Sequence, residues 1–99
     1  MTAYIMVQVA IKDTHRYSDY AAMVPASLAV YGGRFLIRGG RLETLEGDWQ
    51  PKRFVMIEFD SVEQAKRWWD SDEYREARDL RQSIAETEMI VVEGYSPQD

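Results

Sequence analysis

The chain of 99 residues contains no cysteine and a single histidine, His15. Without cysteine it has no disulfide, no thiolate nucleophile and no cysteine metal site, and a reducing cytoplasm is the default compartment. Helical periodicity places His15 on the water-facing side of its segment. We therefore expect no Ser-His-Asp triad, no histidine metal cluster and no His-ligated haem, and we predict neither a cofactor nor a metal.

Long hydrophobic runs and positive charge are also scarce. No apolar run approaches the roughly 18 residues that span a membrane, and the first residues lack the basic stretch and cleavage site of a signal peptide. Twelve Lys and Arg against 17 Asp and Glu give a net charge of −5, which repels a phosphate backbone. These features predict a cytoplasmic protein that binds neither a membrane nor nucleic acid.

Hydrophobic residues make up 45% of the chain without a shift in composition, which predicts one domain over residues 1–99. Apolar residues alternate in four segments, which we predict to be strands at 4–11, 34–38, 53–59 and 89–95. Spacings of three and four residues predict one helix that begins near Asp13 or Thr14, and further helix after Ser61. The order predicts an α+β, ferredoxin-like βαββαβ fold with a four-stranded antiparallel sheet.

Glycine and proline mark the expected boundaries. We predict that Gly32 and Gly33 close the first helix and that Pro25 kinks or restarts it. The Gly39–Gly40 pair has two interpretations: a tight hairpin turn, or a bulge inside a strand that continues to Glu46. The bulge is favoured, because the following residues already supply a turn before the next strand.

Both faces of the predicted sheet are apolar, although the helices can cover only one. The face left over carries large hydrophobic side chains in three strands: Tyr4, Met6, Ala10, Phe54, Met56, Met89 and Val91. An exposed apolar sheet of this size is typical of an association surface. We therefore predict a homodimer in which two sheets pack face to face, and a monomer with tolerated surface hydrophobes is the alternative.

Several segments, taken in order and spacing, identify a resemblance to a known family. They are DTHRYSDY, YGGRFLIRGG, LEGDWQPKRFVMIEF, AKRWWDSDEY, LRQ and VVEGY. Together they resemble domain of unknown function 1330, a small bacterial family in the dimeric α+β barrel superfamily. The resemblance implies that fold and a dimer. It implies no activity, although the superfamily includes cofactor-independent monooxygenases, muconolactone-type isomerases and haem-degrading proteins.

Members of that superfamily hold ligands between the helices and the sheet, so polar residues expected there are candidates. Helical counting puts Ala77, Leu80 and Ile84 on a buried face, with Tyr74 and Arg81 at its edge. Arg81 could bind a ligand carboxylate together with Arg38, beside the missing side chain of Gly39. The alternative is that these arginines form ion pairs: Arg38 with Glu58 or Glu43, and Arg81 with Asp79, Glu88 or a helix end.

Aromatic residues form the second candidate group. A wall for a small planar ligand could comprise Tyr17, Tyr20, Tyr31, Trp69 and Tyr74. The alternative is that this stripe is simply core. The sequence thus favours a binding module for a small aromatic or carboxylated metabolite. A cofactor-independent isomerase or monooxygenase is one alternative, and a structural or regulatory dimer without a ligand is another.

Overall fold

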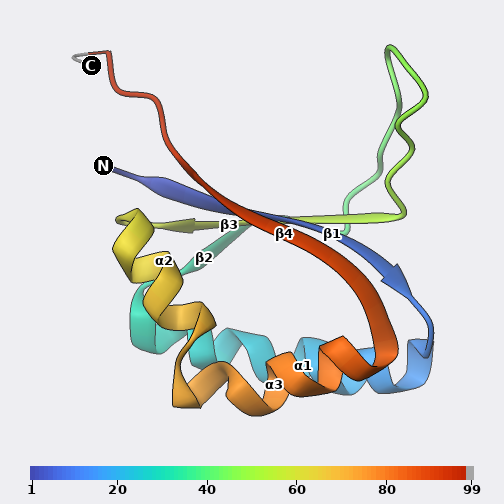
Figure 1. Cartoon of the computed structure of the whole chain (residues 1–99), viewed down its shortest axis with the longest axis horizontal. Helices are drawn as coiled ribbons and strands as arrows, with labels where there is room; N and C mark the ends of the chain where they lie inside the picture. Colours follow the sequence, from blue (N-terminus) through green and yellow to red (C-terminus); the bar gives the residue numbers. More distant parts are fainter. Residues whose placement is uncertain (98–99) are drawn as a thin grey trace.

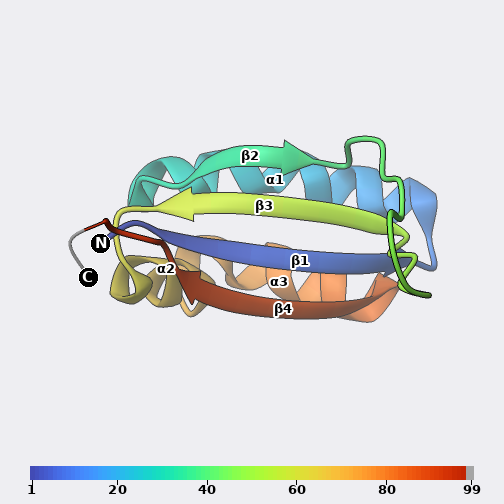
Figure 2. The same cartoon turned by 90° about the horizontal axis from the view of Figure 1, so that it is seen from above.

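The computed structural model describes residues 1–97, which form a four-stranded sheet covered by three helices. The elements are β1 (Ala3–Ile11), α1 (Thr14–Tyr31), β2 (Arg34–Arg38), β3 (Arg53–Phe59), α2 (Val62–Trp69), α3 (Asp72–Ile84) and β4 (Ala85–Glu93). The strand order is β2-β3-β1-β4, and every neighbouring pair is antiparallel (Figure 2). This arrangement confirms the predicted ferredoxin-like α+β fold.

All three helices lie on one face of the sheet, as Figure 1 shows. Seen from above, α1 lies behind the β2 side, whereas α2 and α3 lie behind the β1 and β4 side (Figure 2). The hydrophobic core fills the layer between helices and sheet, and its largest fully buried side chains are Trp68, Tyr74, Phe59 and Val9. We call the sheet face toward the helices the inner face, and the opposite one the outer face.

Side-chain caps set the helix boundaries. The side chain of Asp13 accepts a hydrogen bond from the Arg16 amide (3.1 Å), and that of Ser61 accepts one from the Gln64 amide (3.0 Å). Gly32 takes the left-handed conformation (φ 71°) that ends α1, as predicted. Pro25 does not restart the helix, because α1 continues through it to Tyr31.

Neither interpretation of Gly39–Gly40 is correct. Strand β2 ends at Arg38, and residues 39–52 form an irregular loop before β3. The β-bulge lies earlier, between Phe35 and Ile37, where the register with β3 shifts. Gly39, with a φ of 74°, donates its amide to the Phe54 carbonyl (3.0 Å) and turns the chain away from the sheet. The glycine pair therefore opens a loop.

The outer face carries no helix, and an apolar row crosses it between the Arg34–Glu58 ion pair on one side and the Gln8–Glu88 pair of positions on the other. A row of paired residues crosses all four strands, in the order Ile37, Met56, Met6 and Ile90. Ile90 is 59% exposed, and Val92 is 40% exposed. The loop at residues 39–52 and the segment after β4 both rise on this side of the sheet (Figure 1). The outer face is thus a wide apolar surface with a raised segment at each end.

The two adjacent tryptophans of α2 point in different directions. Trp68 is fully buried, stacks on Tyr74 with ring centroids 4.0 Å apart, and donates its indole N–H to the Ser27 hydroxyl (3.0 Å). Trp69, the predicted wall residue, is 39% exposed instead. Adjacent helical residues differ by about 100° in direction, so only one of the two can face the core.

This difference predicts unequal effects on stability. Trp68→Ala should lower the free energy of unfolding by about 3–5 kcal/mol, because it leaves a large cavity and removes the buried hydrogen bond to the Ser27 hydroxyl. The matched variant Trp69→Ala should lower it by no more than about 1 kcal/mol. Urea unfolding measures both values, and similar losses for the two variants would contradict the observed phase of α2.

Candidate functional site

A pocket lies between α1, α3 and the inner face of the sheet. Its lining is Val7, Val9, Tyr17, Tyr20, Ala21, Val24, Phe35, Arg38, Arg53, Val55, Ile57, Trp68, Arg81 and Met89. Apolar and aromatic side chains dominate, and the charged ones are three arginines. We call this the arginine pocket. An enclosed apolar site with a few convergent polar groups is the usual form of a small-molecule site.

Arg81 is the most deeply buried of the three. It is 4% exposed and belongs to the buried stripe of α3 with Tyr74, Ala77 and Ile84, so the prediction that it sits at the edge of that face is wrong. Leu80, predicted in the stripe, is half-buried. The Nε atom of Arg81 donates to the Tyr74 hydroxyl at 3.4 Å, which is a long hydrogen bond. Most of the guanidinium is thus left free to serve the pocket.

Arg38 faces the pocket because of the bulge in β2. Phe35 pairs with Ile57 on the inner face, and simple alternation would then turn Arg38 outward. The extra residue of the bulge reverses the phase, so Ile37 pairs with outward-facing Met56 and Arg38 pairs with inward-facing Val55. The bulge therefore assigns a hydrophobic residue to the outer face and a guanidinium to the pocket.

Pro25 holds the Arg38 guanidinium in place. A proline lacks the amide N–H that would bond the carbonyl four residues earlier, which here belongs to Ala21. Arg38 Nη2 donates to that Ala21 carbonyl at 2.7 Å. Its guanidinium also lies 4.2 Å from the centroid of the Phe35 ring. A break in the helical hydrogen bonding thus supplies the acceptor that positions Arg38.

Arg53 is the pocket arginine that the sequence analysis missed. It starts β3 in phase with the inward-facing Val55 and Ile57, and this alternation was the available signal. Its guanidinium lies 5.4 Å from the centroid of the Tyr17 ring, and its Nε is buried without a hydrogen-bond partner. A Cβ on Gly39 would lie 2.2 Å from Arg53 Nη1, so the glycine makes room for this guanidinium without lining the pocket.

Within residues 1–97, none of the three arginines forms an ion pair with a carboxylate. Three of the four predicted carboxylate partners are engaged elsewhere: Glu58 with Arg34, Glu43 with Arg41 (2.9 Å), and Asp79 with Arg78 (3.7 Å). The fourth, Glu88, pairs across the sheet with outward-facing Gln8, on the face opposite Arg81. Buried charges are normally paired, because isolating them from water is costly. Arg81 is buried and Arg53 half-buried without such a partner, whereas Arg38 is exposed, so the three guanidinium groups bring positive charge to one pocket without an internal counter-ion.

Two tyrosine hydroxyls border the pocket. Tyr20 and Tyr74 are buried, and their hydroxyl oxygens lie 2.8 Å apart. Burial, together with the neighbouring Tyr74, raises the pKa of Tyr20 above its ordinary value, so it remains a neutral hydroxyl throughout the physiological range. Tyr20 lines the pocket, whereas Tyr74 lies behind it and links Tyr20 to Arg81. The pocket thus offers a hydroxyl donor beside its guanidinium groups.

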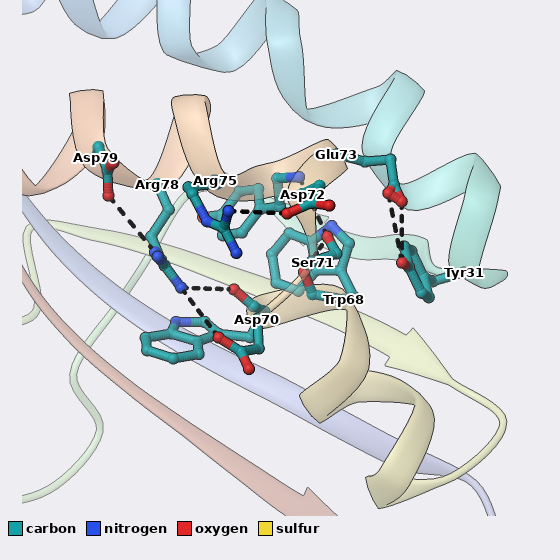
Figure 3. A network of polar contacts seen from close by, with 11 residues as sticks. Tyr31, Trp68, Asp70, Ser71, Asp72, Glu73, Arg75, Arg78 and Asp79 are labelled. Atoms are coloured by element: carbon teal, nitrogen blue, oxygen red, sulfur yellow. Dashed lines mark hydrogen bonds and ion pairs between the residues drawn. The ribbon is translucent and has the colours of Figure 1, made fainter.

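Besides Tyr74, which lies behind the pocket, two more of the five predicted wall residues lie outside it. Tyr31 is at the end of α1, where its hydroxyl donates to Glu73 (3.0 Å), as Figure 3 shows. The guanidinium of Arg78 lies over Trp69, 4.6 Å from the centroid of the Trp69 ring. Arg78 also donates to the Trp69 carbonyl (3.1 Å) and pairs with Asp70 (3.8 Å) across the turn between α2 and α3 (Figure 3). That turn fixes the outward direction of Trp69.

The free volume of the arginine pocket is small, about 20 Å³. This is room for about one water molecule or the oxygens of a head group. Within the part of the chain that the structure describes, no group of three His, Asp or Glu side chains is placed to hold a metal ion. No helix among residues 1–97 is long and apolar enough to cross a bilayer.

The model of one protein family, a domain of unknown function named DUF1330, matches residues 2–95. The chain belongs to the DUF1330 family. This confirms the resemblance noted in the sequence, and no curated protein matches the chain.

Solved structures of low sequence identity share the fold. A protein of unknown function from Rhodopseudomonas palustris is 18% identical, with a TM-score of 0.77 over 97% of this chain and 84% of its own. A dimeric ferredoxin-like protein of unknown function from a Jannaschia species is 9% identical, with a TM-score of 0.72 over 95% and 100%. SnoaB, a cofactor-independent oxygenase from Streptomyces nogalater, is 8% identical, with a TM-score of 0.58 over 96% and 94%.

The role of Pro25 is testable without a ligand. Pro25→Ala restores the amide that bonds the Ala21 carbonyl, so the free energy of unfolding should rise by up to about 3 kcal/mol while Arg38 loses its acceptor. Side-chain ¹H–¹⁵N NMR should then show faster proton exchange at the Arg38 guanidinium. The control Pro51→Ala, in the loop, should leave that exchange unchanged, and slow exchange in Pro25→Ala would contradict the assignment.

Proposed function

We propose that this DUF1330 protein is a cytoplasmic homodimer that binds a small carboxylate in the arginine pocket of each protomer. The observation that carries the proposal is the convergence of Arg38, Arg53 and Arg81 on one largely apolar pocket, with no carboxylate of residues 1–97 paired to them. Guanidinium groups match the geometry of a carboxylate through paired N–H donors. The small free volume favours a planar carboxylate head over a bulkier phosphate.

The aromatic lining defines the rest of the ligand. Tyr17, Tyr20 and Trp68 surround the guanidinium groups and present ring surfaces. Such a lining supports an apolar or aromatic group attached to the carboxylate, and with about 20 Å³ in the pocket itself that group would extend beyond it. The net charge of the chain is −5, whereas the charged side chains that line the pocket are three arginines, so the pocket is positive within a negatively charged protein. That contrast supports a selected anion site.

The outer face supports the homodimer. Its apolar row crosses the entire sheet, and an unaccompanied apolar face of this width is unusual for a monomer. A second copy presents the same row and can pack on it with two-fold symmetry. The helices and the arginine pocket lie on the opposite face, so each protomer would keep its own pocket accessible in the dimer (Figure 1).

The second candidate is a cofactor-independent isomerase or monooxygenase whose substrate carries the reactivity. The Tyr20 hydroxyl favours it, because a neutral donor beside guanidinium groups can stabilise an enolate as its charge develops. The fold shared with SnoaB is compatible with this candidate and does not assign it. A dimer that binds no ligand is the third candidate, and it requires that the pocket binds no carboxylate.

The pocket predicts opposite effects on binding and stability. Arg81→Met removes an unpaired buried charge at similar volume, so the free energy of unfolding should rise by about 1 kcal/mol or more. The same variant, and Arg53→Met, should weaken benzoate binding at least tenfold, since each removes charged hydrogen bonds.

Titration calorimetry and urea unfolding measure these effects. Arg75→Met is the matched control on α3, since Arg75 is exposed and pairs with Asp72 (2.8 Å). It should change neither quantity appreciably. Equal benzoate affinity in all four proteins would remove the proposed site.

The dimer is tested on the outer face. Met6→Lys places a charge at the centre of the apolar row and should convert a particle of twice the 11.5 kDa chain mass into a monomer. Val30→Lys, at an exposed position on α1, is the control and should remain dimeric. Light scattering at micromolar concentration distinguishes the two species. A wild-type particle of 11.5 kDa would contradict the homodimer.

A further inference from the structure

A larger groove lies beside the arginine pocket, between α2, α3 and the edge strand β4. Its volume is about 620 Å³, which is within the range of ligand sites. The lining is Ile5, Ala65, Lys66, Trp69, Asp70, Arg81, Gln82, Thr87, Met89, Ile90 and Val91. Apolar side chains predominate, and the polar ones come from α2, its C-terminal cap, α3 and Thr87. We call this the β4 groove.

The groove and the arginine pocket share two walls, Arg81 and Met89. Arg81 is buried, and its side chain borders both spaces. Met89 is half-buried and has a flexible, unbranched side chain that can change conformation at low cost. The two spaces are therefore neighbours separated by a movable side chain.

The arginine pocket and the β4 groove differ in volume, and this difference indicates which part of a ligand each could hold. The arginine pocket has room for a carboxylate head alone, about 20 Å³, whereas the groove has room for a tail. Its walls suit an apolar tail, since Trp69, Ile90 and Val91 expose hydrophobic surface there. Exposed apolar side chains grouped around a hollow are typical of a binding site.

Unsatisfied polar atoms point to the same place. Among residues 1–97, two buried side-chain polar atoms have no hydrogen-bond partner: Arg53 Nε and Thr87 Oγ1. Arg53 lines the arginine pocket and Thr87 lines the groove. Leaving such atoms unpaired costs about 1–3 kcal/mol each, and native proteins keep few of them. One unpaired atom therefore belongs to a residue of each of the two neighbouring spaces.

We propose that the ligand is an amphipathic carboxylate whose head binds the three arginines and whose apolar tail passes Met89 into the β4 groove. This inference rests on the proposed function and extends it, because it names the class: carboxylates with an extended alkyl or arylalkyl tail. Most of the groove lining comes from α2, α3 and the inner face of the sheet, and Ile90, at the edge of the outer row, is the one lining residue shared with the proposed dimer surface, so dimer formation through the outer face leaves the α2 and α3 walls of the tail site open.

The test is a chain-length series of straight carboxylates, from butanoate to decanoate, titrated below their micelle concentrations. For the wild-type protein, affinity should rise about twofold to fourfold per methylene, the range for half to full burial of each group. Trp69→Gln and Val91→Asn should each weaken decanoate binding far more than butanoate binding. Val30→Gln, on the exposed side of α1, should preserve the full dependence on length.

The outcomes separate the two proposals. If the carboxylates bind in a way that needs Arg81, but their affinity does not rise from butanoate to decanoate, the tail site is overturned and the arginine site stands. A length dependence that persists in Trp69→Gln and Val91→Asn would also overturn the tail site, because the tail would then lie elsewhere. Binding of neither short nor long carboxylates, or equal decanoate binding by Arg81→Met, would overturn both.

Discussion

Three guanidinium groups share the inner face of the sheet with the hydrophobic core, and much of the structure serves to hold them there. Arg81 is buried in the stripe of α3, Arg53 leaves its Nε unpaired, and Arg38 reaches the carbonyl that Pro25 leaves free. The arrangements of Arg81 and Arg53 oppose stability, since a polar group is removed from water without full compensation, whereas Arg38 stays exposed. Proteins retain such features chiefly where function needs them.

The packing around the pocket offsets this cost. Trp68 stacks on Tyr74 and approaches Phe59, with ring centroids 5.6 Å apart, so one aromatic cluster joins α2, α3 and β3. The hydroxyl pair of Tyr20 and Tyr74 ties α1 to α3 above the same cluster. The arginines therefore sit beside a rigid aromatic wall, and a ligand would meet groups that need little rearrangement.

One irregularity serves both faces of the sheet. The bulge in β2 sends Ile37 to the outer face and Arg38 to the inner face, although regular alternation would have done the reverse. The row of hydrophobic residues on the outer face is thereby completed at its edge, and the pocket gains its third guanidinium. The proposed association surface and the proposed anion site thus depend on the same extra residue.

Sequence periodicity predicted most of the fold and less of the site. Strand positions and caps such as Ser61 depend on neighbouring residues, so they can be read directly. The phase of β4 could not, because both of its faces are apolar: Met89 and Val91 were expected on the uncovered face and instead pair with inward-facing Val7 and Ile5. The bulge in β2 contains no glycine, so the sequence carries no signal for it. A charged residue such as Arg81 is not expected in the buried stripe of a helix. The choice between Trp68 and Trp69 depends on the turn that separates α2 from α3. These features depend on contacts between distant segments.

The most direct test of the account is a crystal structure of the protein grown with hexanoate. We expect the carboxylate between Arg38, Arg53 and Arg81, with the alkyl chain directed past Met89 toward β4. A structure in which those guanidinium groups pair with the protein's own carboxylates, while hexanoate binds elsewhere or not at all, would contradict it.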